Sequence, residues 1–394
     1  MISVDEALEQ LFALADPTEV TTVPLAEAAG RVLAEPIVAA RDQPPFAASA
    51  MDGYAMAAED AVAGRTTRVI GEAVAGAGFA GAVNPGESVR IFTGAPVPQG
   101  AERVVIQEDV TREGDHATIT GKPGPGAHIR PAGADFALGD SVSAPRLLSP
   151  QDLALIASMN AAQVRVHRRP VVALMANGDE LVMPGETPGP DQIIASNAFG
   201  LAALVETVGA TARMLPIARD NPASIKALLQ MAEGADLVVT IGGASVGEHD
   251  LIAPVTAELG MTPAFYKVAM RPGKPLMAGR LGQTAMVGLP GNPVSAMVCG
   301  HIFLVPMLRA MQGLGRAPAP RLQARLTADI PANGPREHYM RASVDAQGIT
   351  AAPTQDSALL TVLARSNALL IRPPSDGPRA AGETLEYVPL TPRS

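Results

Sequence analysis

The stretch ADLVVTIGGASVGEHD, residues 235–250, decides the fold. Its apolar, β-branched run at 237–241 is typical of a parallel strand that is buried on both faces. The run ends in a glycine-rich loop whose candidate ligand contacts are Gly242, Gly243, Ser245 and Gly247. The loop leads to Asp250, where a helix is predicted to begin. Because α/β sheets bind ligands beyond the carboxyl ends of their strands, and glycine N–H groups can approach an anion closely, the stretch predicts one wall of an anion or nucleotide crevice.

Outward from this stretch, residues 170–311 alternate between strand and helix patterns. Strands are predicted at 171–175, 212–217, 237–241, 262–268 and 285–289. Helices are predicted after Ser196, Asn221-Pro222, Asp250 and Asn292-Pro293. Ser and Asn are good N-caps, and Pro fits the first helical position, so these residues mark helix starts. The alternation indicates a doubly wound α/β domain.

The segments on either side of this domain have different patterns of apolar residues. Apolar spacing predicts an amphipathic helix over 4–15 and a second, short helix over 24–33. Short apolar runs between Gly, Pro and Asn clusters predict a β region at about 55–130, and similar runs after Arg321 predict a small C-terminal β-domain. Residues 76–81 match GxGxxG formally. We interpret them as a β-domain loop because no helix follows, as a dinucleotide fingerprint requires.

Composition excludes several classes of protein. The chain of 394 residues is 47% hydrophobic and 18% charged, which suits globular cores. Aromatic residues make up 3% and the net charge is -9, which argue against nucleic-acid and anionic-membrane partners. A lone cysteine, Cys299, fits a reducing, cytoplasmic compartment. The acidic N-terminus does not resemble a signal peptide, and the apolar run 301–308 is interrupted by Pro306, so no membrane span is expected.

Three loops follow strands at one predicted sheet edge. Besides the opening loop, they are residues 177–180, which contain Glu180, and residues 290–295. In the last of these the candidate contacts are Gly291, Asn292, Pro293 and Ser295. We expect Asn292 to cap the helix, leaving free N–H groups and the Ser295 hydroxyl to face a bound anion. Any one loop is compatible with ordinary strand–helix turns, whereas three together favour a ligand site.

Basic residues cluster at the end of a predicted strand. The cluster consists of Lys267, Arg271 and Lys274, in a loop that two prolines make rigid. A solvated cationic turn is one interpretation. In a chain of net negative charge, a receptor for phosphate or another oxyanion is the alternative that we favour.

Acidic candidates lie in loops along the chain. They are Asp52, Asp135, Glu180, Asp220 and Asp250. An isolated loop aspartate is usually a turn or cap residue. If several carboxylates surround a phosphorylated ligand, however, a divalent metal such as Mg²⁺ is needed to bridge them to it. The histidines lack the paired spacing of a zinc catalyst.

Taken together, these motifs resemble the molybdopterin molybdenumtransferase family, which contains the MoeA proteins and the gephyrin E domain. The matching segments run in the family's order: PPFAASAMDGYA (44–55), IFTGAPVPQGAERVV (91–105), IRPAGAD (129–135), NGDEL (177–181), ADLVVTIGGASVGEHD (235–250), KVAMRPGKP (267–275) and GLPGNPVSA (288–296). The resemblance implies four parts: a mostly helical linker subdomain (1–45 and 131–168), a β subdomain (46–130), a MogA-like molybdopterin-binding α/β domain (169–316) and a C-terminal β-domain (317–394).

The resemblance also implies a reaction. Molybdate would be inserted into adenylylated molybdopterin, with Mg²⁺-assisted loss of AMP. The residues implied to hold the adenylylated pterin and the metal are Asp52, Thr93, Asp135, Glu180, Asp220 and Asp250, with Asp52, Glu180 and Asp250 as metal ligands. Lys267, Arg271 and Lys274 would bind anionic groups, and Asn292, Pro293 and Ser295 would line the molybdate end.

Partners are implied in the same way. The family is an elongated homodimer whose crevice is shared between the N-terminal β part of one chain and the α/β domain of the other. A molybdopterin adenylyltransferase is the candidate protein partner.

Two positions depart from the family pattern. The segment 355–358 (QDSA) departs from the glycines usual in the family, and Arg271 replaces a lysine of some members. Two alternatives stay open: a molybdopterin adenylyltransferase, and a non-catalytic gephyrin-like scaffold.

Overall fold

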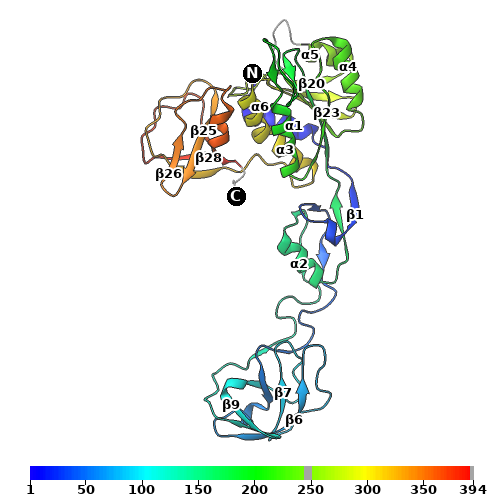
Figure 1. The fold of residues 1–394 in the computed structure, drawn as a ribbon, viewed down its shortest axis with the longest axis vertical. Helices are drawn as coiled ribbons and strands as arrows, with labels where there is room; N and C mark the ends of the chain where they lie inside the picture. The colour runs from blue at the N-terminus through cyan, green and yellow to red at the C-terminus, as the bar shows by residue number, and fades with distance from the viewer. Residues whose placement is uncertain (244–250, 391–394) are drawn as a thin grey trace.

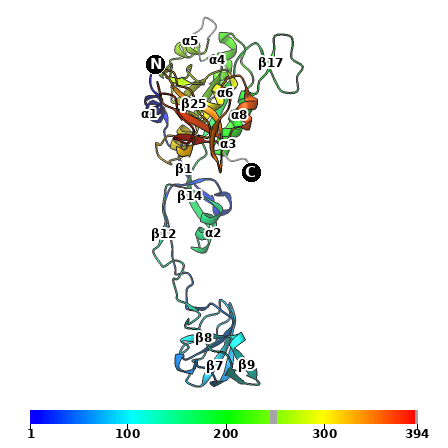
Figure 2. The same cartoon turned by 90° about the vertical axis from the view of Figure 1, so that its left-hand side faces the viewer.

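The structure is a computed structural model that describes residues 1–243 and 251–390 of the chain. The molecule is elongated (Figures 1 and 2). An α/β domain and a C-terminal β-domain lie side by side at one end, and the N-terminus is found there (Figure 1). A β-subdomain occupies the other end, and a narrow arm joins the two (Figure 1). Residues at opposite ends of one chain therefore cannot share a site within that chain.

The α/β domain is built on a six-stranded sheet. In order across the sheet, its strands are β18 (Thr211–Met214), β15 (Val171–Ala176), β19 (Leu237–Ile241), β23 (Thr284–Leu289), β22 (Met277–Leu281) and β20 (Thr262–Phe265). The first four are parallel to one another, whereas β22 runs antiparallel to both of its neighbours, β23 and β20. The sequence did not predict β22, whose MAGRL run has no β-branched residue. The doubly wound α/β class is confirmed, with an antiparallel edge added.

Helices cover both faces of this sheet. They are α1 (Val4–Leu14), α3 (Asn197–Thr207), α4 (Pro222–Met231), α5 (Ile252–Glu258), α6 (Pro293–Cys299) and α7 (Val305–Met311). Side chains of β15 alternate between the faces. Leu174 packs in the core formed with α1, α3, α6 and α7, whereas Met175 packs with α4 and α5. This two-sided burial explains the continuous apolar strands of the sequence.

Several element ends differ from the prediction. The strand predicted over 212–217 ends at Met214, and the one predicted over 262–268 ends at Phe265. Pro306 does not interrupt the apolar helix, because a π-helical turn (η4, Gly300–Leu304) precedes it. Residues Pro293–Met311 therefore form one continuous helix that is apolar and long enough to cross a membrane. Because 78% of its most apolar window is buried inside the protein, we interpret it as a core helix.

The arm is mainly a β structure. Its sheet has the order β1 (Val20–Pro24), β14 (Gln163–His167), β2 (Val32–Leu33) and β13 (Arg146–Leu147), and β3 (Ile37–Val38) pairs with β12 (Ser141–Val142). One α-helix, α2 (Pro150–Ser158), packs on this region. The expectation of a mostly helical linker is not met in the residues described, because α1 packs into the α/β core instead. The helix predicted over 24–33 is wrong: only a 3₁₀ turn, Leu25–Glu27, forms before Gly30 at φ +67°.

The β-subdomain at the far end is a six-stranded sheet. Its order is β8 (Arg103–Ile106), β5 (Gly53–Met56), β7 (Glu87–Ile91), β6 (Thr66–Ala73), β10 (His116–Ile119) and β9 (Val110–Glu113). A short pair, β4 (Ala48–Ser49) with β11 (Ile129–Arg130), lies where the chain enters and leaves it. Residues 76–81 lie in a loop after β6 with no helix following, so they do not have the context of a dinucleotide fingerprint.

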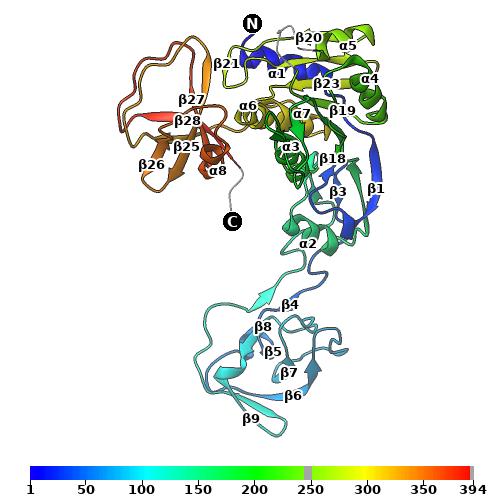
Figure 3. The ribbon, with the colours of Figure 1, turned by 45° about the horizontal axis from the view of Figure 1, so that its top comes forward.

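The C-terminal domain continues from the α/β domain without a gap. Its strands are β21 (Met270–Arg271), β25 (Glu337–Asp345), β27 (Ala368–Arg372), β28 (Thr384–Pro389) and β24 (Leu322–Arg325), with β26 (Gly348–Ala351) paired to β25. The short helix α8 (Leu360–Arg365) contacts α6 and β25 (Figure 3). Because β21 belongs to the basic loop of the α/β domain and pairs with β25, it joins that loop to the C-terminal sheet.

Candidate functional site

A cavity of about 270 Å³ opens at the carboxyl ends of the parallel strands. The loops after β15, β19 and β23 all line it, as the topology of such sheets favours. Its lining residues include Gly178, Glu180, Asp220, Gly242, Gly243, Gly291 and Pro293. The three predicted glycine loops therefore meet in one cavity. Leu181, Ile193 and Ile194 form an apolar part of the same wall, beside a loop that projects from the domain (Figure 2).

Two asparagines hold the glycine loops together. The side chain of Asn197, at the start of α3, donates to the Gly291 carbonyl at 2.7 Å. With its amide nitrogen oriented toward the neighbouring carbonyls, Asn177 donates to the Gly242 oxygen at 2.8 Å. Gly242 and Gly243 have φ values of +93° and +64°, which favour glycine. The sequence reasoning missed both asparagines as site residues, although each stands directly beside a predicted strand end or helix start.

The acidic wall of the cavity is preorganised. The Asp179 N–H donates to Asp220 Oδ2, and the Asp220 N–H donates to Asp179 Oδ1, both at 3.2 Å. The guanidinium of Arg219 donates to the carbonyls of Asp179 and Leu181 at 3.3 Å. These contacts join the loop after β15 to the loop before α4, so that Glu180 and Asp220 line one cavity.

The loop after β23 differs from its prediction in two respects. Pro293 stands at the start of α6 and lines the cavity, as expected. Asn292, however, makes no side-chain capping bond. Ser295, in the first turn of α6, is 5% exposed and is not among the residues that line the cavity. That its hydroxyl faces a bound anion stays a prediction.

Residues of the basic loop line two different cavities. Pro275 lines the glycine-loop cavity, whereas Lys274 lies exposed beside it. Lys267 is half-buried, and its carbonyl accepts a bond from Ile2 N–H at 3.1 Å. Arg271 lines a second cavity, against the C-terminal domain. The three cations therefore do not converge on one cavity in a single chain.

The residues predicted from the N-terminal motifs lie in the β-subdomain and near it. Asp52 Oδ1 accepts the Thr93 N–H at 2.7 Å and the Thr93 hydroxyl at 2.8 Å. Both bonds lower the pKa of the Asp52 carboxyl, and the bond from the Thr93 backbone has the larger effect. Asp135 follows β11, and its N–H donates to the Gln43 carbonyl at 2.9 Å. Asp52 and Thr93 thus form a local pair beside β5 and β7 of the β-subdomain, which lies at the other end of the molecule from the α/β domain (Figure 1).

Three predicted residues lie outside the described part of the chain: Ser245, Gly247 and Asp250. The described loop residues on either side of them are Gly243, which lines the cavity, and Leu251, which precedes α5.

The sequence did not predict the buried basic side chains of the C-terminal sheet, and two of those described have nitrogen atoms without a hydrogen-bond partner. Arg341 is fully buried, and its Nε and Nη1 atoms have no hydrogen-bond partner. Burial, followed by the nearby Arg271, lowers the pKa of Arg341 to about 10. His338 is 5% exposed, and its Nε2 atom is also without a partner. The only sequence signal that could have indicated them is a basic residue within the apolar pattern of a strand. Their unsatisfied donors suit anionic groups.

Comparisons with known proteins agree along the whole chain. Residues 2–160 match the MoeA N-terminal region (domain I and II), residues 173–310 match a probable molybdopterin binding domain, and residues 323–390 match the MoeA C-terminal region (domain IV). A protein of Haemophilus influenzae named molybdopterin molybdenumtransferase is 34% identical, over 99% of each chain. A Mycobacterium tuberculosis protein named molybdopterin molybdenumtransferase 2 is 37% identical, over 94% of this chain and 95% of its own.

A solved structure shows the same similarity along the whole chain. The molybdopterin biosynthesis MoeA protein of Pyrococcus horikoshii superposes with a TM-score of 0.84 at 28% sequence identity. The match covers 98% of this chain and 99% of that one. The similarity therefore includes the arm and both β domains as well as the α/β domain.

Proposed function

The chain belongs to the MoeA family of molybdopterin molybdenumtransferases. From this premise we propose which of its residues bind each substrate of the reaction. It is an enzyme that transfers molybdenum to molybdopterin. In our proposal the substrates are adenylylated molybdopterin and molybdate, and AMP is released. The adenylyltransferase and scaffold alternatives are not favoured, because full-length relatives carry the transferase name.

We assign the phosphorylated substrate to the glycine-loop cavity. The observation that carries this assignment is the convergence of Gly178, Gly242, Gly243 and Gly291 on one cavity. Their backbone lets phosphate oxygens approach N–H donors without a Cβ in the way. The apolar wall at Ile193 and Ile194 suits a flat heteroaromatic ring. Glu180 and Asp220 would repel the phosphates unless a cation lies between them.

Magnesium is our proposal for that cation, and the donor set fits it. Within the described residues no group of three or more metal-ligating side chains occurs, so a site made by the protein alone is not expected there. Mg²⁺ usually takes one or two carboxylates and completes its coordination with phosphate oxygens and water. Glu180 and Asp220 can supply the carboxylates. When bound, the ion would neutralise charge on the phosphate that loses AMP.

Molybdate requires positive charge and N–H donors. We propose that Lys267, Lys274 and Arg341 supply them at the join between the α/β domain and the C-terminal sheet. Two observations support the choice: the free guanidinium nitrogens of Arg341, and the bond from its Nη2 to the Asp356 carbonyl, which holds it beside the QDSA segment. That segment is itself anchored, because the Ser357 carbonyl accepts the Val294 N–H of α6 at 3.1 Å.

The roles of Asp52, Thr93 and Asp135 require a second chain. In one chain these residues lie in or near the β-subdomain, far from the glycine loops (Figure 1). We propose a homodimer in which the β-subdomain of each chain covers the cavity of its partner. Asp52 is suited to this role because Thr93 occupies one of its carboxylate oxygens and holds the other in a fixed direction.

The decisive experiment measures AMP release from purified adenylylated molybdopterin. We expect release to require the protein, molybdate and Mg²⁺ together. AMP transfer from ATP onto molybdopterin would instead favour the adenylyltransferase alternative. Full cofactor formation by a Glu180→Ala variant would contradict the assignment of the cavity, and a Glu186→Ala variant, which alters an exposed carboxylate of the projecting loop, is the matched control.

A further inference from the structure

A second cavity, of about 360 Å³, lies in the C-terminal domain and is not used by the proposed reaction. Three basic residues line it in one row across three strands. Arg271 of β21 is in register with His338 of β25, and His338 is in register with Arg372 of β27. Because directly opposed residues of neighbouring strands point to the same face of a sheet, the three side chains share this cavity.

The cavity is on the other face of the sheet from the molybdate residues of our proposal. Residues alternate between faces along a strand, so His338 and Met340 point one way and Tyr339 and Arg341 the other. Accordingly, Met340 and His338 line the cavity, whereas Tyr339 packs in the core shared with the α/β domain. The cavity is therefore separate from the glycine-loop site.

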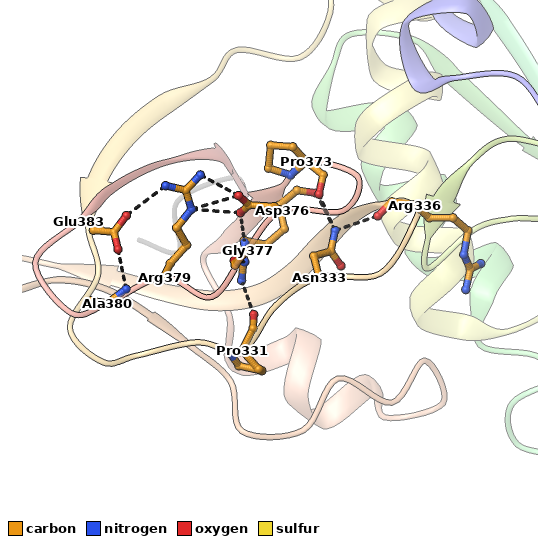
Figure 4. Close-up of polar contacts among 10 residues, drawn as sticks. Pro331, Asn333, Arg336, Pro373, Asp376, Gly377, Arg379, Ala380 and Glu383 are labelled. Atoms are coloured by element: carbon orange, nitrogen blue, oxygen red, sulfur yellow. Dashed lines mark hydrogen bonds and ion pairs between the residues drawn. The ribbon is translucent and has the colours of Figure 1, made fainter.

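The charge of Arg372 is already neutralised. Its Nε donates to Asp376 Oδ2 at 2.7 Å, and its Nη1 donates to the Pro331 carbonyl at 3.0 Å. Figure 4 shows Asp376 held from the other side by Arg379. Arg271, in contrast, is exposed and forms no ion pair with any residue that the structure describes. The row thus contains one uncompensated cation at the mouth of the cavity.

His338 is the unsatisfied group beneath that cation. It is 5% exposed, and no hydrogen bond reaches its Nε2 atom. Burial first, and then the positive charges of Arg271, Arg341, Arg372 and Arg336, lower the pKa of His338 to about 3. A buried polar atom without a partner costs free energy. An anion between Arg271 and His338 would accept a hydrogen bond from Nε2. Its negative charge would offset the neighbouring positive charges and so raise the pKa of His338.

The walls around these residues are rigid. Asn333 Nδ2 donates to the carbonyls of Arg336, Arg372 and Pro373, at 2.9, 3.2 and 2.7 Å (Figure 4). One acidic side chain also lines the cavity: Asp329, whose Oδ1 accepts the Ala381 N–H at 2.7 Å. Asp329 is exposed, so it can turn its charge toward solvent. The buried part of the lining is therefore basic.

We propose that this cavity binds a compact, doubly charged tetrahedral oxyanion between the Arg271 guanidinium and a protonated His338. The two positive charges match the two negative charges of such an ion, and binding takes up one proton onto Nε2. The oxyanion can be free in solution or can be the phosphate of a nucleotide. Both share the chemistry that Arg271 and His338 recognise.

Histidine NMR on the full-length protein tests this inference. Imidazole-labelled protein is titrated with pH in the absence of oxyanion, with sulfate, and with AMP. Sulfate does not titrate between about pH 5 and 8, so any proton uptake belongs to the protein. The His338 signal is assigned by its loss in a His338→Gln variant. The His116→Gln variant, which alters an exposed histidine of β10, is the control.

We expect sulfate to raise the pKa of His338 from about 3 into the ordinary range near 6.5. Sulfate affinity should then rise up to about tenfold for each pH unit of acidification, and His338→Gln should remove this slope while leaving the protein folded. A shift with AMP but not sulfate would assign the cavity to a nucleotide phosphate. An unmoved His338 signal with both ligands, or the same slope in His338→Gln, would overturn the inference. None of these outcomes depends on molybdenum transfer.

Discussion

At the scale of single residues, function here depends on side chains whose partners come from distant sequence. Asp52 is oriented by Thr93, which lies 41 positions later. The Arg90 guanidinium, 4.6 Å from the Phe92 ring centroid, donates to the Gly53 carbonyl at 3.0 Å and so holds the backbone next to Asp52. Gly53 itself must be glycine, because a Cβ there would meet the Val105 carbonyl oxygen at 2.0 Å. The aspartate is therefore a fixed carboxylate rather than a loop cap.

The Asp52→Asn variant tests that role. It keeps the size of the side chain and removes its charge. We expect AMP release to fall by about 10²-fold or more, as when an electrostatic group of an active site is removed. The variant should also need more Mg²⁺ for half-maximal rate. Glu113→Gln, at an exposed position of β9, should leave both quantities unchanged. Equal activity of Asp52→Asn and the parent would exclude Asp52 from the reaction.

At the scale of elements, loops and strand ends position the site, and their geometry explains the glycines. Gly242 ends β19 at φ +93°, and a Cβ there would lie 3.0 Å from the Asn177 carbonyl oxygen. The basic loop is constrained in the same way, since a Cβ on Gly273 would lie 2.5 Å from the Sγ atom of Cys299 in α6. The glycines therefore permit close approach of two backbone segments as well as unusual dihedral angles.

Gly242→Ala separates these two effects. The positive φ alone should cost about 1 kcal/mol of stability. The added contact with Asn177 should displace the loop and weaken binding of adenylylated molybdopterin by about tenfold or more, which corresponds to about 1.4 kcal/mol. Gly260→Ala is the matched control, because Gly260 has φ +84° with open space around it. It should show the stability cost in urea unfolding without the loss of binding.

The joint between the arm and the α/β domain is a second feature at this scale. Arg168 donates from Nη1 and Nη2 to the two Asp236 oxygens, at 2.8 and 2.7 Å, and from Nε to Glu19 at 2.6 Å. Asp236 also accepts the Val171 N–H at 2.7 Å. Its burial would raise the pKa of the carboxyl, but the bonds from Arg168 and Val171 prevail and lower it.

Asp236→Asn should therefore destabilise the protein by about 2 kcal/mol, less than for a fully buried pair because Arg168 is one-third exposed. Since the pKa of Asp236 is depressed in the folded state, this stabilisation is present above the ordinary aspartate pKa of 3.8 and is lost as pH falls below it. Urea unfolding at several pH values measures both. Glu35→Gln, which removes an exposed partner of Arg165, should cost no more than about 0.5 kcal/mol. A similar loss in both variants would contradict this account.

At the scale of the whole molecule, the elongated shape is the main functional fact. The β-subdomain, which carries the Asp52–Thr93 pair, and the α/β domain, which contains the glycine-loop cavity, lie at opposite ends of the molecule (Figure 1). No bending within the compact α/β domain can bring them together. If both serve one reaction, as we propose, then two chains must combine their complementary ends, and the arm sets the distance between them.

Mixed dimers test this arrangement. Asp52→Ala and Glu180→Ala would each inactivate every site of their own homodimer. A heterodimer of the two would contain one site with both defects and one intact site. After co-refolding or co-expression, random pairing should restore about a quarter of the parent activity. If the mixture stays inactive although heterodimers are shown to form, the two residues do not act across chains.

Much of this protein follows from local sequence. Strand β19 and the ends of α1 and α2 can be predicted from apolar period, Pro and caps, because these are short-range signals. The glycine loops are predictable too, because parallel strands of one sheet end at the same edge. By contrast, Val32–Leu33 looked helical and forms a strand, because its pairing partners Arg146 and Leu147 are more than a hundred residues away.

The sequence by itself thus determined the family, the fold class and the three loops that converge on a cavity. Only the tertiary structure decided which charged groups are satisfied and which are not. Arg271, His338 and Arg372 form a row because three distant strands pair in one register, and Ser295 is buried in the first turn of α6. Long-range pairing and burial set these outcomes, and no local pattern of residue types encodes them.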